Sequence, residues 1–253
     1  MIRLLASLVG GVALGAVLVG GTSGQERSSS PLPDTFRIAA FSSPLSTHPE
    51  TVGWLPLAFG DDKGTTAYRV GQEGGRTCLM AEAQASSSGL LKLVDVDPGS
   101  FPLLRWSWWV RGPIQAGDLT KKEGDDFAAR IFVNFRFDPS GAGLLTRLRH
   151  SLAGKRFGGE APGRSLVYVW GNRAPIGAVA PSAYTDEAVQ FVIRSGEVGA
   201  GQWWTEERDL LRDFREAFGK APPSIVSIAV MTDADDTGGE ALACYGDILL
   251  LSR

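Results

Sequence analysis

The sequence is poor in the residues that many enzymes use for nucleophilic and metal chemistry. It holds only two cysteines and two histidines among 253 residues. His48 and His150 lie in segments without a nucleophile motif, and neither cysteine has the flanking residues of a catalytic thiol. The sequence contains no G-x-S-x-G, no H-E-x-x-H and no glycine-rich phosphate loop. These absences give catalysis by the common hydrolase and nucleotide-enzyme routes little support.

Long hydrophobic runs are also scarce, and the one that is present begins at Leu4. It stays uncharged to Gly21, follows the positive charge of Arg3, and is succeeded by small residues at positions 22–24. A positive start, an apolar stretch and small residues are typical of a signal peptide. We therefore predict a signal peptide over residues 1–24 and an exported protein, periplasmic or extracellular. An uncleaved N-terminal anchor is the alternative, because about 18 apolar residues can just span a bilayer.

Charge of one sign is not in large excess. The formal net charge is −3, and a mildly acidic chain has no general electrostatic reason to bind nucleic acid or an anionic membrane. We expect no nucleic-acid partner, and no membrane contact after signal cleavage. Serine and proline are concentrated in residues 25–34, which we interpret as a linker. No second linker or repeat follows, so residues 35–253 are expected to form a single β-sandwich domain.

The two cysteines, Cys78 and Cys244, both lie in strand-like segments. Export would permit a disulfide between them. Two separate buried thiols are the alternative, because cysteine also packs as a small hydrophobic residue. The sequence leaves both readings open.

Alternation of apolar and polar residues predicts β-strands along most of the chain. The clearest cases are residues 104–110 and 126–137, in which every second residue is apolar. Glycine, proline, asparagine and aspartate separate the predicted strands. Many short strands with few helices favour a mainly all-β fold, an antiparallel β-sandwich or jelly roll with one or two short helices. The other predicted strands are 36–41, 77–83, 90–94, 165–170, 189–194, 225–231 and 242–251.

Two segments have a helical period instead. Residues 206–218 repeat leucine and phenylalanine at helical spacing, with Thr205 as a candidate N-cap and Gly219 as a stop. Residues 144–157 carry four leucines on one side, with basic residues around them. We predict a short helix in each segment.

Three stretches of the chain resemble the DUF3047 family of exported bacterial proteins of unknown function. The first is LRWSWWV at 104–110, the second is KEGDDFAARIFVNF at 122–135, and the third extends from Arg208 through AVMTDADDT to Ile248. The resemblance covers roughly residues 36–253 and implies an exported single domain without a defined activity. The strand with alternating tryptophans is also similar, in fold, to the jelly-roll carbohydrate-binding modules.

One face of the predicted strand 126–137 carries a group of polar side chains. Asp126 and Arg130 are four residues apart, so they project from the same face. A carboxylate, a guanidinium and an amide on one face can hold a polyol or a carboxylated ligand, and nearby aromatic rings would supply flat surfaces for a sugar. A structural ion pair that orders the strand entrance is the alternative. The predicted ligand-binding residues are Asp126, Arg130, Asn134, Trp109, Tyr168 and Trp170.

A second group of carboxylates occurs near the C-terminus. Asp233, Asp235 and Asp236 are spaced like part of a Ca²⁺-binding loop, and hard cations need several such oxygens. The twelfth position from Asp233 is Cys244, where an EF-hand requires glutamate. The same residues are ordinary turn formers, which is the alternative. No cofactor is expected apart from this candidate Ca²⁺ site.

These features together predict a non-catalytic binding protein of the cell envelope that holds a saccharide or another polar small ligand. One alternative is a glycan-acting hydrolase or lyase in which Asp126, Asp233 and Glu206 converge. Another is a structural or protein-interaction domain.

Overall fold

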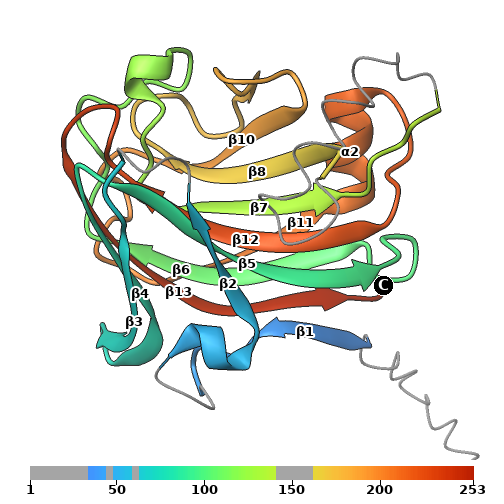
Figure 1. Ribbon diagram of the computed structural model, residues 1–253, viewed down its shortest axis with the longest axis horizontal. Helices are drawn as coiled ribbons and strands as arrows, with labels where there is room; N and C mark the ends of the chain where they lie inside the picture. Colours follow the sequence, from blue (N-terminus) through green and yellow to red (C-terminus); the bar gives the residue numbers. More distant parts are fainter. Residues whose placement is uncertain (1–33, 44–47, 59–62, 141–161) are drawn as a thin grey trace, which may run out of the picture. The chain divides into compact units, whose positions relative to one another are not determined.

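The computed structural model describes residues 34–43, 48–58, 63–140 and 162–253 (Figure 1). The predicted signal peptide and the predicted helix at 144–157 lie outside the described residues. Residues 33–253 form one compact unit. Within the part of the chain that the structure describes, no helix is long and apolar enough to cross a membrane.

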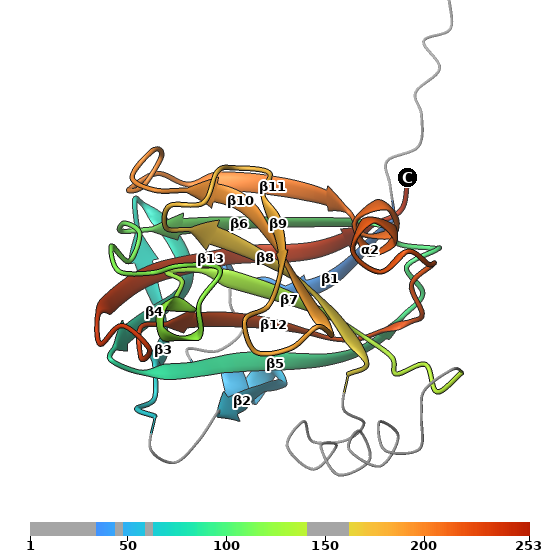
Figure 2. The ribbon, with the colours of Figure 1, turned by 90° about the horizontal axis from the view of Figure 1, so that it is seen from above.

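The described residues form a two-sheet sandwich with one α-helix, as Figure 2 shows from above. The strands are β1 (Thr35–Ala39), β2 (Trp54–Ala58), β3 (Ala67–Glu73), β4 (Arg76–Gln84), β5 (Ser87–Val96), β6 (Leu103–Val110), β7 (Arg130–Phe135), β8 (Arg164–Gly171), β9 (Val179–Pro181), β10 (Ala188–Ser195), β11 (Trp204–Asp209), β12 (Ile225–Asp233) and β13 (Glu240–Leu251). The helix is α2 (Leu210–Phe218), and 3-10 turns occupy Pro49–Val52 and Lys122–Gly124.

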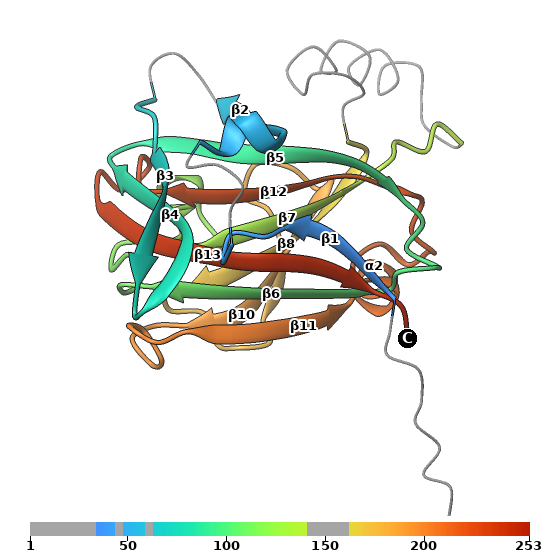
Figure 3. The ribbon, with the colours of Figure 1, turned by 90° about the horizontal axis from the view of Figure 1, so that it is seen from below.

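Each sheet joins strands that are far apart in the sequence. Sheet A has the order β11-β6-β13-β4-β3, and β1 pairs with β13 beside this path (Figure 3). Sheet B has the order β2-β5-β12-β7-β8-β10-β9. The pairings are antiparallel except that β8 and β10 run parallel. The prediction of a mainly antiparallel β-sandwich is confirmed.

The core lies between the sheets and contains the large aromatic residues of β6 and β8. Trp106 and Trp108 point inward from sheet A because alternate residues of a strand face opposite sides. Tyr168 and Trp170 meet them from sheet B, with 5.2 Å between the ring centroids of Trp106 and Tyr168 and 6.0 Å between those of Trp108 and Trp170. All four side chains are almost completely buried. The alternating tryptophans therefore hold the two sheets together.

Strand β7 begins four residues later than the predicted strand 126–137. Before Arg130 the backbone makes only isolated bonds to the neighbouring strands, from the amide of Trp170 to the carbonyl of Ala129 at 2.9 Å and from the amide of Asp233 to the carbonyl of Phe127 at 3.3 Å. Side chains provide further bonds. The amide of Phe127 donates to Asp233 Oδ1 at 3.2 Å, and Asn172 Nδ2 donates to the carbonyl of Asp126 at 2.7 Å. The alternation of the sequence continues through this segment, but the regular strand pairing begins only at Arg130.

The predicted helix 206–218 is correct only from Leu210 onward. Residues up to Asp209 form β11, in which Thr205 pairs with Ser107 of β6. Asp209 is the N-cap, accepting from the amide of Arg212 at 3.1 Å. Gly219, with a φ of 69°, ends the helix in the left-handed conformation that glycine adopts without strain. The first residues of the segment therefore form a strand, because they pair with the edge of β6.

The outer face of sheet A, turned away from the core, carries a disulfide between Cys78 of β4 and Cys244 of β13. These strands are neighbours, and the two Cα atoms are 5.6 Å apart. Trp109 and Trp203 pack against the bridge. Trp109 therefore lies on the opposite side of the sandwich from the polar face of β7.

Candidate functional site

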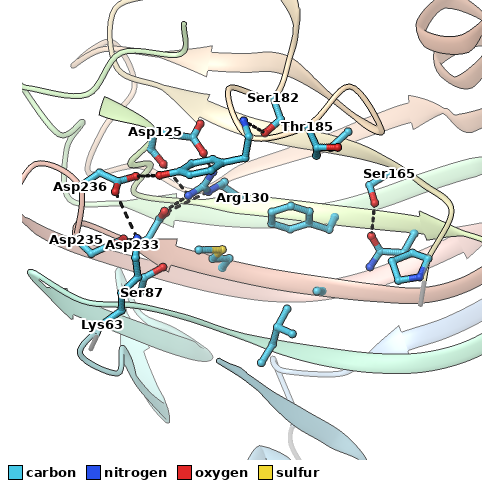
Figure 4. A pocket seen from close by; sticks show the side chains of 18 residues that line it. Lys63, Ser87, Asp125, Arg130, Ser165, Ser182, Thr185, Asp233, Asp235 and Asp236 are labelled. Atoms are coloured by element: carbon cyan, nitrogen blue, oxygen red, sulfur yellow. Dashed lines mark hydrogen bonds and ion pairs between the residues drawn. The ribbon is translucent and has the colours of Figure 1, made fainter. Parts of the chain in front are cut away.

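A groove of about 420 Å³ lies on the outer face of sheet B, turned away from sheet A (Figure 4). Its floor contains Phe132 of β7 with Ala229 and Met231 of β12, whose neighbours along each strand point into the core. The loop that follows β9, with Ser182 and Tyr184, lines it as well. We call this space the sheet B groove. Its floor is mainly apolar, and its charged groups gather at one end.

The charged end of the groove is built around Arg130, the first residue of β7. Its Nη1 lies 3.1 Å from Asp125 Oδ2, its Nη2 donates to the backbone carbonyl of Asp125 at 2.8 Å, and its Nε donates to Asp233 Oδ1 at 3.1 Å. A further close ion pair joins Arg130 Nη2 to Asp233 Oδ2. The side chain of Arg130 is only 6% exposed, and those of Asp125 and Asp233 are 5% and 2% exposed. This is a buried Asp–Arg–Asp triad, and it joins the start of β7 to the end of β12.

Neighbouring groups complete the hydrogen bonding of the triad. Gln190 Nε2 donates to Asp125 Oδ1 at 3.0 Å, and the amide of Phe127 donates to Asp233. The guanidinium also lies over the ring of Phe127, 4.8 Å from its centroid. Both oxygens of Asp125 and of Asp233 therefore already accept from donors.

A second charged group lies beside the triad, on the turn after β12. Lys63 makes a close ion pair with Asp235 Oδ2, and its Nζ lies 3.4 Å from Asp236 Oδ1. The hydrogen bond to Asp235 raises the pKa of Lys63 above its ordinary value, so the ammonium stays charged. The hydroxyl of Tyr184 donates to Asp236 Oδ2 at 2.7 Å. The pKa of Tyr184 is also raised, mainly because the side chain is partly buried and secondly because of this hydrogen bond.

Asp126 does not pair with Arg130, contrary to the expectation from strand alternation. Its carboxylate accepts from the amide of Asp236 at 3.2 Å, and from the amide and the hydroxyl of Thr237 at 2.7 and 2.6 Å. Asp126 thus binds the turn after β12, more than 100 residues along the chain. Because β7 starts only at Arg130, the alternation that would have placed the two side chains on one face does not apply.

The sequence groups Asp233, Asp235 and Asp236 as a candidate Ca²⁺ site, but the structure groups the acidic residues differently. Asp233 belongs to the Arg130 triad. Asp126 takes its place beside Asp235 and Asp236, and one carboxylate oxygen from each of these three lies within 4.8 Å of the others. Convergent carboxylates of this kind can hold a hard cation.

Apart from Asp126, which binds the turn after β12, the predicted ligand-binding residues lie in three places. Arg130 and Asn134 both line the sheet B groove. The amide of Asn134 is already engaged, donating to Ser227 Oγ at 2.9 Å and accepting from Ser165 Oγ at 2.7 Å. Tyr168 and Trp170 are in the core, and Trp109 is beneath Trp203 on the outer face of sheet A. These three aromatic residues share no surface with the groove.

Nor does the structure bring together the three acids of the hydrolase alternative. Glu206 lies on β11 in sheet A, where it accepts from Arg194 Nε at 2.7 Å and from Trp108 Nε1 at 3.3 Å. It does not line the sheet B groove, whereas Asp233 does. The expected convergence of Asp126, Asp233 and Glu206 in one groove is therefore not found.

The balance of charge in the groove limits what it can bind. Its lining contains four aspartates, Asp125, Asp233, Asp235 and Asp236, against two cationic side chains, Lys63 and Arg130. Most of the N–H groups of Arg130 are already bonded within the triad. The guanidinium therefore has no free pair of N–H groups with which to bind a carboxylate ligand in a bidentate manner. The groove accordingly favours neutral, hydroxyl-rich or cationic ligands over anions.

Several solved structures have a distant likeness to the chain, and two of them are an adhesin domain and a glycoside hydrolase domain. The K2 cleaved adhesin domain of Lys-gingipain has 11% identity and a TM-score of 0.37, over 87% of this chain and 100% of that one. The glycoside hydrolase domain of Endo-D from Streptococcus pneumoniae R6 has 11% identity and a TM-score of 0.31, over 79% of this chain and 21% of that one. The chain thus spans about a fifth of the latter protein. Similarity at this level says nothing about the groove or its ligand.

No curated protein matches the sequence. The model of one family does match it, over residues 52–249, and that family is described as a protein of unknown function. The matched range includes the charged end of the groove, the disulfide and nearly all of both sheets. The chain belongs to the DUF3047 family.

Proposed function

We propose that the protein is an exported, non-catalytic binding protein that holds a saccharide in the sheet B groove. The observation that carries this proposal is the meeting of an apolar floor with a row of hydrogen-bonding groups in one groove of about 420 Å³. Small-molecule sites of 300–1,000 Å³ are typical, and they combine a mostly apolar lining with a few placed polar groups. A sugar ring has the matching character, with C–H groups on its faces and hydroxyls around its edge.

The positions of the side chains suit such a ligand. Phe132 and Met231 offer a surface for the apolar face of a ring, and Tyr184 stands at the rim with 51% of its surface exposed. Ser182, Thr185 and the carboxylate of Asp236 supply donors and acceptors for hydroxyl groups. The excess of carboxylates excludes strongly anionic ligands from the charged end.

The geometry supports binding better than hydrolysis. A glycosidase needs one carboxylic acid that can give a proton to the leaving group and a second carboxylate across the bond. Asp125 and Asp233 are both held by Arg130 and by further donors. Neither carboxyl group is therefore free to act as the acid.

Replacing Tyr184 by alanine tests the placement of the ligand. The change removes one ring contact and one hydroxyl from the rim, so affinity for a bound saccharide should fall about five- to thirtyfold. Stability should change little because half of the side chain is exposed. The measurement is calorimetry with free mono- and disaccharides, starting from a screen on the unmodified protein.

A matched control is Ile176→Ala, which removes an apolar side chain that is 62% exposed and does not line the groove. It should bind the same saccharide with unchanged affinity. Equal affinities of the Tyr184→Ala variant and the parent protein would refute the placement, and failure of every saccharide to bind would refute the ligand class.

Export is the second part of the proposal, and it rests on the uncharged run from Leu4 to Gly21 behind Arg3. The intact mass of protein recovered from the cell envelope should correspond to loss of the first ~20–30 residues. A full-length mass in the membrane fraction would establish the N-terminal anchor instead.

A further inference from the structure

The carboxylates of Asp126, Asp235 and Asp236 come from two separate segments of the chain and converge beside the charged end of the groove, which Asp235 and Asp236 line. One oxygen from each lies within 4.8 Å of the other two. Asp126 precedes β7, whereas Asp235 and Asp236 follow β12. Like charges at this distance repel one another, so a cation between them would be stabilising, although the amides of Asp236 and Thr237 already donate to Asp126.

One carboxylate oxygen of Asp235 is buried in a way that the hydrogen bonding of the turn does not explain. Its side chain is only 6% exposed, and its Oδ1 is buried without a hydrogen-bond partner among the described residues. Gln190 Oε1 is also buried without a hydrogen-bond partner among the described residues. The amide nitrogen of the same side chain donates to Asp125 in the adjacent triad. Asp235 Oδ1 and Gln190 Oε1 are both acceptors. A buried acceptor without a donor is unfavourable unless a donor or a cation reaches it.

Lys63 supplies part of the missing charge. Its ammonium contacts Asp235 Oδ2 and lies near Asp236 Oδ1, so one positive charge already sits against two of the three carboxylates. One ammonium against three carboxylates still leaves two negative charges. A third of the Lys63 side chain is exposed, and its flexible stem allows the ammonium to move into solvent.

We propose that Asp126, Asp235 and Asp236 bind Ca²⁺, and that the ion and the Lys63 ammonium exchange at this position. An all-oxygen, carboxylate-rich set is the chemistry that hard cations require, and Ca²⁺ accepts six to eight oxygens in an irregular arrangement. Three carboxylates supply part of that number, and water from the adjacent groove completes it. Mg²⁺ fits less well because it demands near-octahedral geometry. The ion goes beyond the proposed saccharide binding, because its retention requires no sugar.

The test is calorimetric titration of the metal-free protein with CaCl₂ alone. Asp235→Asn keeps the shape of the side chain but removes its charge, and Ca²⁺ affinity should fall at least tenfold. Lys63→Gln removes the competing ammonium, and affinity should rise about three- to fivefold, as expected for loss of one partly exposed ion pair. Asp97→Asn is the matched control, because Asp97 caps a turn at Gly99 and does not line the groove. It should leave Ca²⁺ affinity unchanged.

Circular dichroism shows whether each variant is folded, and Asp236→Asn replaces Asp235→Asn if the latter is not. The inference is overturned if neither the unmodified protein nor Lys63→Gln binds Ca²⁺, if the carboxamide variants bind it normally, or if Lys63→Gln leaves its affinity unchanged. Because the probe is the metal alone, these outcomes are separate from those of the saccharide experiment. Saccharide binding that persists in EDTA would preserve the proposed function while removing any role of the ion in it.

Discussion

Replacing Arg130 by methionine is expected to lower the free energy of unfolding by about 3–5 kcal/mol. The guanidinium is buried between Asp125 and Asp233, whose side chains are 5% and 2% exposed. Without it, two carboxylates remain close together, out of water and without their cation. Methionine keeps much of the apolar stem, so the loss reports mainly on the charge. Urea denaturation of the variant and the parent protein measures the difference.

The control for this variant is Arg69→Met. Arg69 and Glu82 form an ion pair at 3.3 Å on β3 and β4, but their side chains are 55% and 46% exposed. Loss of an exposed pair should change the free energy of unfolding by less than about 1 kcal/mol. Adding Asp125→Asn and Asp233→Asn to Arg130→Met should restore part of the stability, since the uncompensated charges are then removed. If Arg130→Met lowers the free energy of unfolding no more than Arg69→Met does, the triad does not stabilise the fold as a buried group of ion pairs.

The disulfide is expected to contribute about 5 kcal/mol to the same free energy, as calculated from the entropy of the unfolded chain. Cys78 and Cys244 are separated by 166 positions, so the bridge closes a loop that contains most of the described domain. Reduction should therefore lower the urea midpoint strongly. The double variant Cys78→Ala, Cys244→Ala should be insensitive to reductant. Two free thiols, counted on the unfolded and unreduced protein, would contradict the bridge.

The sequence predicts the strands of the core well because their alternation is strong. In β6 and β7 every second residue is apolar, and the structure places those residues between the sheets. Strands β2, β3 and β9 were not predicted. All three are sheet edges, and β2 includes Pro56, so neither burial nor alternation marks them clearly.

The site was harder to predict, and Asp126 shows the reason. Alternation applies only where the backbone is a strand, and the segment before Arg130 is held instead by side-chain hydrogen bonds and by isolated backbone bonds. The partner of Asp126 is a turn at residues 236–237, which no local pattern connects to it. Arg130 was recognised, but its partners are Asp125, five residues earlier in the chain, and the distant Asp233.

The aromatic residues show a second limit. Alternation correctly separates Trp108 from Trp109 onto opposite faces of β6, but it does not say which face meets the other sheet. Tyr168 and Trp170 could therefore be read as a ligand surface, although both lie in the core. Lys63 and Tyr184 were missed because they lie outside the regular strands, where the sequence has no period to interpret.

The central claim is that the sheet B groove is where the protein binds its ligand. The most direct measurement is the change in backbone amide NMR shifts on titration with the saccharide that binds best in the screen. The account predicts shifts concentrated at residues 182–188 and 229–236, around Tyr184 and the floor of the groove, and little change near Trp203 on the outer face of sheet A. Shifts centred on Trp203, with residues 182–188 unaffected, would contradict it.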